Sequence, residues 1–250
     1  MRKLSILLAI LFLIQIACKP DRLLNVKDGF DSDSLSTIWT RDKFIHGALN
    51  FQTIYVRSGN KAAMLTLRPG DQIEEEKGTI LERAELKESK KLFAVEKSIY
   101  EYSFSIFLPP DFPIVPSRLV IAQWKQDCKS GDCDPASPVI ALRFVSGKFY
   151  VTLQTEPKQI TLFSQDETIL NQWLDFKFKI QFSRMQDGVI KAWLNGEQII
   201  DYKGITAYTQ TYGYPIPGVF YFKMGLYRDH MDLPMTIYLD DYKKNQIPNL

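Results

Sequence analysis

Three short segments of the sequence carry polar residues at every second position, which is the spacing of one face of a β-strand. The residues concerned are Arg83 and Glu85, then Gln123 and Lys125, and finally Tyr221, Lys223 and Tyr227. Arginine, lysine and glutamine side chains can hold a carboxylate, and a tyrosine hydroxyl can accept or donate a proton. If the three faces share one surface, they predict a site that binds an acidic ligand and moves a proton.

Each segment also has a simpler interpretation. Arg83 and Glu85 fit a solvated cross-strand charge ladder, and taken alone that reading is favoured. The tyrosines fit ordinary strand aromatics with wet hydroxyls. Arg143, on the polar side of another apolar strand, either lines a groove or faces solvent. Gly225 weakens its strand unless something approaches the backbone closely there, and we expect a ligand to do so.

The elements that must position these residues are strands, because a period of two dominates the chain. Apolar and polar residues alternate over 100–108, 149–153 and 176–182. Asn195-Gly196 is a strong hairpin signal. There is no long helical period, repeat or low-complexity linker. The sequence predicts an all-β fold, an antiparallel β-sandwich with one broad and curved outer face, as a single domain over 31–250.

Composition narrows the classes of function. The chain has 250 residues, of which 45% are hydrophobic and 24% charged, and its formal net charge is +2. That much apolar surface excludes a disordered chain. The charge is too balanced for a protein that grips nucleic acid by bulk electrostatics, so no nucleic-acid partner is expected.

The N-terminus predicts export. Arg2 and Lys3 precede an apolar run over 4–16, which is too short to span a bilayer comfortably and ends just before Cys18. Residues 1–17 therefore fit a signal peptide. Cys18 resembles the lipidated first residue of a bacterial lipoprotein, although Gln15 stands where leucine is usual; ordinary cleavage nearby is the alternative. We expect 18–30 to be a tether or a first edge strand.

This interpretation places the protein outside the cytoplasm. It is expected as a lipoprotein of the bacterial outer membrane or cell surface, held to the membrane through Cys18, or in the periplasm. Removing the segment 1–17, with its two basic residues, leaves the mature chain formally neutral. Attraction for a charged ligand must then come from local clustering of charge.

Cys128 and Cys133 form a close pair around Ser130-Gly131. In an exported chain this pattern predicts a disulfide that closes a small loop. A zinc site is set aside because no histidine or second cysteine pair lies nearby. No metal or cofactor is expected. The acidic run over 74–76 leaves a role for calcium open, but no Asp-rich ligand loop is visible.

A resemblance now appears. Arg83-Ala84-Glu85-Leu86, Gln123-Trp124-Lys125 and the segment Tyr221–Arg228 resemble, in order and rough spacing, the three signature strands of jelly-roll polysaccharide lyases. That group includes alginate lyases, heparin lyases and glucuronan lyases. The resemblance covers most of 40–243. It implies that the sandwich is of the jelly-roll, concanavalin-like kind with a concave substrate groove. It also implies an enzyme that cleaves an anionic, uronic-acid-containing polysaccharide by β-elimination.

The resemblance also assigns roles. Tyr227 matches the catalytic tyrosine and Lys223 the lysine four positions before it. Arg83 matches a substrate-binding arginine, and Gln123 the glutamine that neutralises the substrate carboxylate. Lys125 stands where these families commonly carry histidine, and lysine is a poor proton acceptor at its ordinary pKa.

One of the two histidines can fill that gap. Some members of the group use a histidine from an early strand, so His46 is expected to supply the imidazole, with a structural role as the alternative. Further contacts to substrate are expected from four residues: Lys125, Glu85, Tyr221 and Arg143. We expect the protein to act as a monomer.

The main alternative function is a non-catalytic carbohydrate-binding module on the same scaffold, since fold does not determine function. A glycoside hydrolase is a weaker third possibility. It needs two carboxylates that flank the cleaved bond, whereas Glu82 and Glu85 are expected on opposite faces of their strand.

Overall fold

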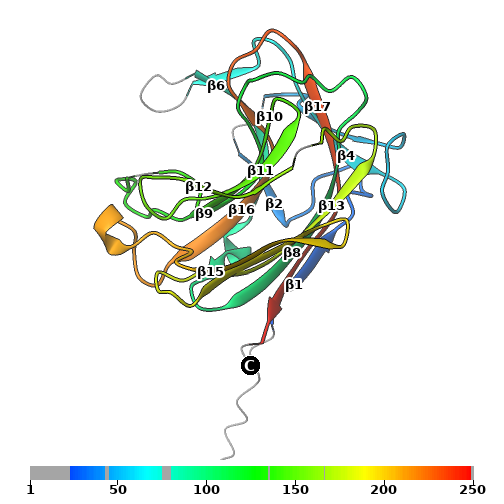
Figure 1. Ribbon diagram of the computed structural model, residues 1–250. Helices are drawn as coiled ribbons and strands as arrows, with labels where there is room; N and C mark the ends of the chain where they lie inside the picture. Colours follow the sequence, from blue (N-terminus) through cyan, green and yellow to red (C-terminus); the bar gives the residue numbers. More distant parts are fainter. Residues whose placement is uncertain (1–22, 43–44, 75–79, 135, 166, 249–250) are drawn as a thin grey trace, which may run out of the picture.

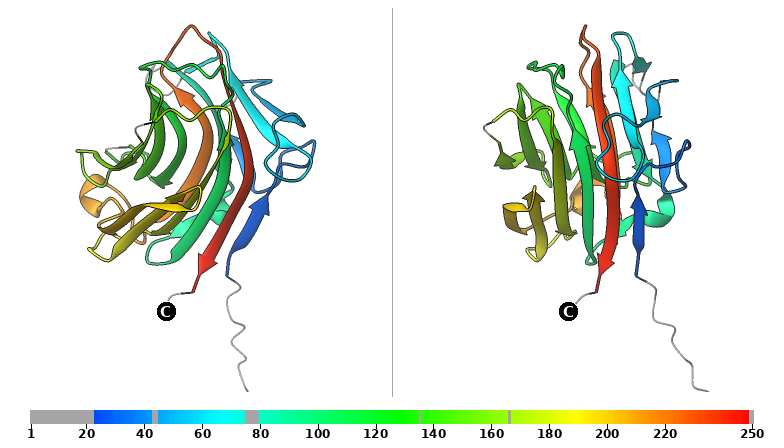
Figure 2. Two further views of the ribbon diagram at one scale, coloured as in Figure 1. Left: turned by 45° about the vertical axis from the view of Figure 1, so that its right-hand side comes forward. Right: turned by 90° about the vertical axis from the view of Figure 1, so that its right-hand side faces the viewer.

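The structure, a computed structural model, describes residues 23–42, 45–74, 80–134, 136–165 and 167–248. In these residues two antiparallel sheets are stacked face to face, and both are curved (Figures 1 and 2). No α-helix occurs in the described part of the chain, which has only the short 3₁₀ helices η1 (Lys90–Leu92) and η2 (Gln210–Tyr212). The predicted all-β jelly-roll sandwich is therefore confirmed.

The eight-stranded sheet has the order β15-β14-β13-β8-β17-β4-β3, with β1 paired to β17. Its strands are β1 (Asn25–Asp28), β3 (Leu49–Gln52), β4 (Ala62–Leu67), β8 (Ile99–Phe107), β13 (Trp173–Gln181), β14 (Gly188–Leu194), β15 (Glu197–Gly204) and β17 (Met235–Ile247). The predicted Asn-Gly hairpin joins β14 to β15. The expected edge strand near the N-terminus is β1, while the segment with Cys18 lies outside the described residues.

The nine-stranded sheet has the order β12-β11-β10-β9-β16-β6-β2, with β5 beside β6 and β7 beside β16. Its strands are β2 (Trp39–Asp42), β5 (Gln72–Glu74), β6 (Ile80–Glu88), β7 (Ala94–Val95), β9 (Leu119–Gln126), β10 (Ile140–Val145), β11 (Lys148–Leu153), β12 (Ile160–Ser164) and β16 (Val219–Arg228). The three motif segments lie in β6, β9 and β16, which are direct neighbours.

The core lies between the sheets and is rich in aromatic rings. Trp124 of β9 is fully buried, and its ring centroid lies 4.6 Å from that of Phe178 and 4.9 Å from that of Phe222. Strict alternation of buried and half-buried residues along β13 matches the period seen in the sequence. One face of each sheet is thereby committed to packing, so ligands must bind on the outer faces or at the edges.

A β-bulge interrupts the alternation in β9. Ala122 pairs with Leu142 and Met224, but Val120 pairs with Arg143 and Tyr227, so the register shifts around Ile121. Ile121 and Ala122 both join the core, and Val120 changes face. Strict alternation from Leu119 to Gln126 predicts that Val120 shares a face with Ala122 and Trp124, and the bulge makes that prediction wrong. A bulge adds a residue to one strand and reverses the facing of what lies beyond it.

Gly225 lies in β16 beside this irregularity, with a φ of 146°. A Cβ atom at this position would come within 2.2 Å of the carbonyl oxygen of Ala84 and 2.9 Å of the Cα atom of Glu85. The neighbouring strand β6, rather than a ligand, fills the space that the missing side chain leaves. The glycine thus allows β6 and β16 to approach closely where each carries a site residue.

No helix in the described ranges is long and apolar enough to cross a membrane.

Candidate active site

Four side-by-side positions form one row across the nine-stranded sheet. Arg83 on β6 pairs with Tyr227 on β16, Tyr227 pairs with Val120 on β9, and Val120 pairs with Arg143 on β10. Directly paired residues in a sheet project from the same face. The row therefore brings together three polar side chains that are up to 144 positions apart in the sequence.

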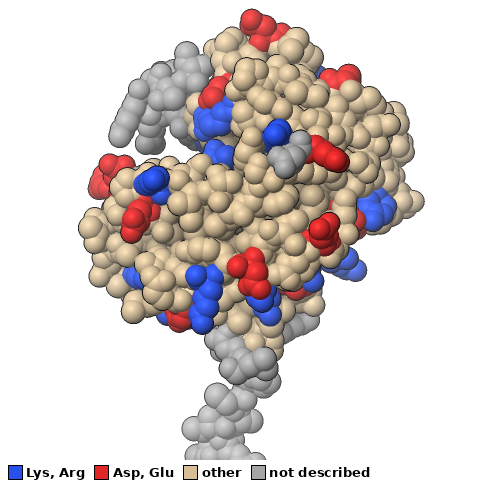
Figure 3. Space-filling model, in the orientation of Figure 1, with Lys and Arg blue, Asp and Glu red and all other residues tan. Residues whose placement is uncertain are grey.

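These residues line a pocket of about 250 Å³, called the Tyr227 pocket below. Its lining residues are Arg83, Arg118, Val120, Gln123, Lys125, Ala136, Ser137, Pro138, Arg143 and Tyr227. Four of them are cationic and none is acidic, so the pocket favours an anionic ligand. Figure 3 shows Lys and Arg side chains on the walls of a notch at the upper left of the molecule.

The centre of the pocket is a contact between Arg83 and Tyr227. The guanidinium carbon of Arg83 lies 4.5 Å from the centroid of the tyrosine ring. Arg83 itself is held by Glu85, whose carboxylate accepts a hydrogen bond of 2.5 Å from Nε of the arginine. The expectation that Arg83 and Tyr227 share a surface is met.

Glu85 was expected to contact substrate, but the structure buries it completely beneath the pocket. Its carboxylate accepts hydrogen bonds from Arg83 and from Nε2 of Gln123, and Nζ of Lys223 lies 4.0 Å away. Three strands thus converge on one carboxylate. The two hydrogen bonds and the nearby lysine charge offset the cost of burying it, and Glu85 acts by fixing the side chains around it.

Lys223 and Tyr221 lie along β16, outside the lining of the pocket. Lys223 is buried next to Glu85. Tyr221 pairs with Lys125 on β9, and its ring lies 5.2 Å from that of Phe93 and 4.2 Å from Nζ of Lys87. The two residues therefore share the polar face of β16 with Tyr227, as the spacing predicts, but they stand further along it.

Arg118 is a site residue that the sequence reasoning missed. Its guanidinium carbon lies 4.7 Å from the Tyr227 ring centroid, and its side chain donates hydrogen bonds to Asp229. Burial acts to lower the pKa of Arg118, but the hydrogen bonds to Asp229 and Tyr227 outweigh it and raise the pKa. Strict alternation assigns position 118 to the core face, and only the bulge in β9 brings it to the pocket.

Arg143 is a partly buried cation of the pocket. Its Nε donates to Oγ1 of Thr152 at 3.1 Å and its Nη2 to Oε1 of Gln159 at 3.1 Å, and both acceptors are neutral. Burial lowers the pKa of Arg143, and the nearby charge of Arg118 adds to this effect. An anion in the pocket offsets both the burial of the Arg143 charge and its repulsion from Arg118. Arg143 is therefore well suited to hold a carboxylate.

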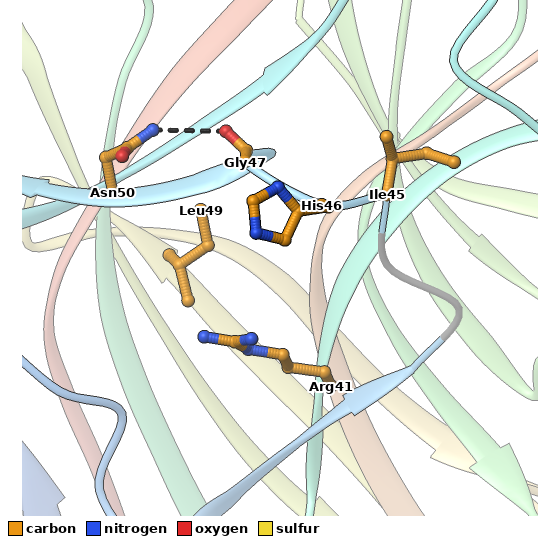
Figure 4. A pocket seen from close by; sticks show the side chains of 6 residues that line it. All are labelled: Arg41, Ile45, His46, Gly47, Leu49 and Asn50. Atoms are coloured by element: carbon orange, nitrogen blue, oxygen red, sulfur yellow. Dashed lines mark hydrogen bonds between the residues drawn. The ribbon is translucent and has the colours of Figure 1, made fainter.

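His46 is absent from the lining of the Tyr227 pocket. It lines a separate hollow with Arg41, Ile45, Gly47, Leu49 and Asn50, which shares no residue with the first. Figure 4 shows the His46 ring and the Arg41 guanidinium pointing into that hollow. The structure does not bring the imidazole together with Arg83 and Tyr227, contrary to the expectation from the sequence.

Glu82 and Glu85 of β6 lie on opposite faces, as predicted. Glu82 is buried, accepts a 2.6 Å hydrogen bond from Nε of Arg228, and lies 2.7 Å from Nδ1 of His230. The carboxyl group of Glu85 is also fully buried. No pair of carboxylates therefore flanks the pocket in the described residues, which removes the basis for a glycoside hydrolase.

The predicted disulfide between Cys128 and Cys133 is present. It closes a short loop directly after β9, and residues 136–138 beyond this loop line the Tyr227 pocket. Among the described residues, no group of three or more His, Cys, Asp or Glu side chains is arranged to hold a metal ion.

Comparisons with solved structures agree with this architecture. A glucuronan lyase from the fungus Trichoderma reesei shares 16% identity and a TM-score of 0.66, over 84% of this chain and 91% of that one. A family 7 alginate lyase shares 16% identity and a TM-score of 0.56, over 82% and 84%. An alginate lyase from Corynebacterium sp. shares 17% identity and a TM-score of 0.54, over 82% and 83%. At these identities the likeness shows the fold.

The family itself is shown by sequence. No curated protein matches the chain at a significant level. The profile of the polysaccharide lyase family, however, matches residues 28–243, a span that includes most of both sheets and the whole Tyr227 pocket. The chain therefore belongs to the polysaccharide lyase family and is an enzyme of the lyase class.

Proposed function

We propose that the protein cleaves a uronic-acid-containing polysaccharide by β-elimination. The observation that carries this proposal is the Tyr227 pocket, where a tyrosine lies against Arg83 and Arg118 in a lining with four cations and no carboxylate. A neutral sugar does not call for that charge, whereas a uronate does. A tyrosine among cations is suited to exchange protons, because positive charge favours its phenolate.

The reaction removes a proton from the sugar carbon next to the carboxylate. While the carboxylate keeps its full negative charge, that proton is too weakly acidic to leave. Cations and amide donors around the carboxylate stabilise the enolate-like intermediate, and they thereby make removal of the proton feasible. The electron pair left on the carbon then forms a double bond to the neighbouring carbon, whose bond to the glycosidic oxygen breaks. That oxygen takes up a proton as it leaves.

The pocket supplies groups for each part of this reaction. We assign the binding of the substrate carboxylate to Arg143, Gln123 and Lys125, which line the pocket on β9 and β10. We assign the proton transfer to Tyr227. Its phenolate takes the proton from the sugar carbon, and the resulting hydroxyl gives it to the leaving glycosidic oxygen. Arg83 contacts the tyrosine and completes the cationic wall.

We further propose that the protein works outside the cytoplasm on an anionic polysaccharide. The apolar run over 4–16 and the position of Cys18 support export and a lipid anchor. A tether at this end of the chain is compatible with the fold, since β1 lies on the eight-stranded sheet and the Tyr227 pocket on the other.

The test is direct, because β-elimination leaves an unsaturated sugar that absorbs in the ultraviolet. The mature protein is incubated with alginate, glucuronan, heparin, chondroitin or hyaluronan, and the absorbance is followed. We expect product from at least one polymer, and loss of at least about 100-fold in rate with Tyr227→Phe while polymer binding persists. Binding without product on every uronate polymer would overturn the proposal.

A further inference from the structure

Asp229 holds Arg118 in place at the end of β16. Oδ1 of Asp229 accepts hydrogen bonds from Nη2 and Nε of Arg118, at 2.6 Å and 3.1 Å, and the Asp229 backbone N–H donates to the carbonyl oxygen of Arg118 at 3.1 Å. Two side-chain contacts and one backbone contact thus join the residue after β16 to the residue before β9. The guanidinium of Arg118 cannot turn away from the sheet without breaking them.

The held guanidinium lies against Tyr227. Its carbon is 4.7 Å from the ring centroid, close to the 4.5 Å of Arg83. Three strands or strand ends supply the positive charges that surround the ring: β6 supplies Arg83, the residue before β9 is Arg118, and β10 supplies Arg143.

We propose that Arg118 is a catalytic residue that stabilises the Tyr227 phenolate by hydrogen bond and charge, and that Asp229 is the positioning residue that keeps it there. This inference rests on the proposed function, because it takes Tyr227 as the residue that transfers the proton. A donor fixed before the reaction loses no free energy in reorienting when charge develops on the oxygen. The chain thereby stabilises its proton acceptor without an imidazole in the pocket.

The structure contains a matched control for the Asp229–Arg118 pair. Arg57, between β3 and β4, forms the same type of ion pair with Asp175 on β13 of the eight-stranded sheet, with Nη2 2.8 Å from Oδ2. The exposed fractions of the two side chains are 43% and 42%, against 37% and 50% for Arg118 and Asp229. Asp175→Asn therefore reports the cost of losing such a pair away from the pocket.

The experiment measures kcat and KM separately for Asp229→Asn, Asp229→Glu and Asp175→Asn. We expect Asp229→Asn to lower kcat about 10-fold and to leave KM within about twofold of wild type. The reason is that Arg118, no longer held in place, acts on Tyr227 during the chemical step and not on the binding of substrate. Asp229→Glu is expected to recover part of kcat. Asp175→Asn is expected to leave both constants unchanged. Equal kcat in Asp229→Asn and wild type would overturn the positioning role.

Arg118 is tested by its pH profile. In Arg118→Gln we expect a lower kcat and an acid limb of the kcat profile that moves to higher pH, since one cation beside the phenolate is lost. A variant that is only misfolded lowers kcat without moving the limb, and unchanged thermal unfolding shows that the chain is folded. A KM effect with normal kcat would make Arg118 a substrate-binding residue and overturn this inference. It would leave the proposed function intact, which fails only if the wild type releases no unsaturated product.

Discussion

Arg83 and Tyr227 are paired across β6 and β16, with the guanidinium carbon 4.5 Å from the centre of the ring. The pairing makes the contact a property of the backbone register, because any shift between the two strands would separate the residues. Glu85, two positions along β6, holds the arginine from below. The predictions that follow concern the parts that maintain this contact and the groups that surround it.

Replacing the two candidate partners of Tyr227 distinguishes their roles. Lys125 lines the Tyr227 pocket and His46 does not, so Lys125→Ala is expected to lower kcat/KM by about 100-fold, the scale for losing a stabilising charge. His46→Ala is expected to stay within about twofold of wild type. Lys125→His restores a side chain that can bind the carboxylate, and we expect it to retain more activity than Lys125→Ala. Loss of activity in His46→Ala would return the imidazole to the mechanism.

The buried carboxylate of Glu85 is expected to matter for both stability and activity. Glu85→Gln removes the charge that compensates Arg83 and Lys223. Removing one partner of a buried ion pair costs about 3 kcal/mol, which denaturant unfolding can measure. We also expect kcat to fall, because Gln123 and Arg83 lose a common acceptor.

Glu197→Gln, at the exposed start of β15, serves as the control for Glu85→Gln and is expected to change neither quantity. If Glu85→Gln unfolds at the same denaturant concentration as wild type, the carboxylate does not compensate those cations.

Gly225→Ala tests the close approach of β6 and β16. The new Cβ would meet the carbonyl oxygen of Ala84 at 2.2 Å, so the strands must separate. We expect a loss of about 1–3 kcal/mol in the free energy of unfolding, and a fall in kcat because Arg83 moves relative to Tyr227.

The control for that substitution is Gly196→Ala in the β14–β15 hairpin. Gly196 has a φ of 87° and no atom within 4 Å of the position that a Cβ would take. It is expected to lose stability through backbone strain alone and to keep full activity. Normal kcat in Gly225→Ala would show that the activity tolerates a shift between the two strands.

Asp240 on β17 predicts a pH dependence of stability. Burial raises its pKa to about 6, although backbone N–H groups of Arg57, Asp241 and Ser58 act in the opposite direction. A raised pKa means that the folded state binds the proton more tightly than the unfolded state, so this group stabilises the fold as pH falls and the benefit is lost as pH rises through about 6.

The measurement compares wild type with Asp240→Asn, which cannot titrate at this position. Relative to this variant, wild type is expected to gain at most about 3 kcal/mol between pH 7 and pH 4. A difference that stays constant over that range would show that Asp240 does not hold its proton in the folded state.

The sequence was informative wherever alternation is regular. The strands of 100–107, 173–181 and 219–228 follow a period of two, and their facing is correct. Arg83, Gln123, Lys125, Arg143 and Tyr227 were selected by type and spacing, and all five line one pocket. The Cys128–Cys133 disulfide followed from the short spacing.

The sequence was misleading where facing or burial depends on contacts between strands. The bulge around Ile121 is set by pairing with β10 and β16, so alternation concealed Arg118. Glu85 has the spacing of an exposed residue, but it is buried by three partners from other positions in the chain. His46 was chosen by residue type and by the resemblance to lyases that use a histidine from an early strand, and neither determines which hollow the turn at 45–47 lines.

All side chains of the Tyr227 pocket come from the nine-stranded sheet and its loops, whereas β1 and β17, the first and last strands, belong to the other sheet. Anything joined to either end of the chain is therefore attached through the layer that takes no part in the chemistry. A carrier resin, a fluorescent reporter or a second catalytic unit can be fused at both ends, and long polymers will still reach the notch.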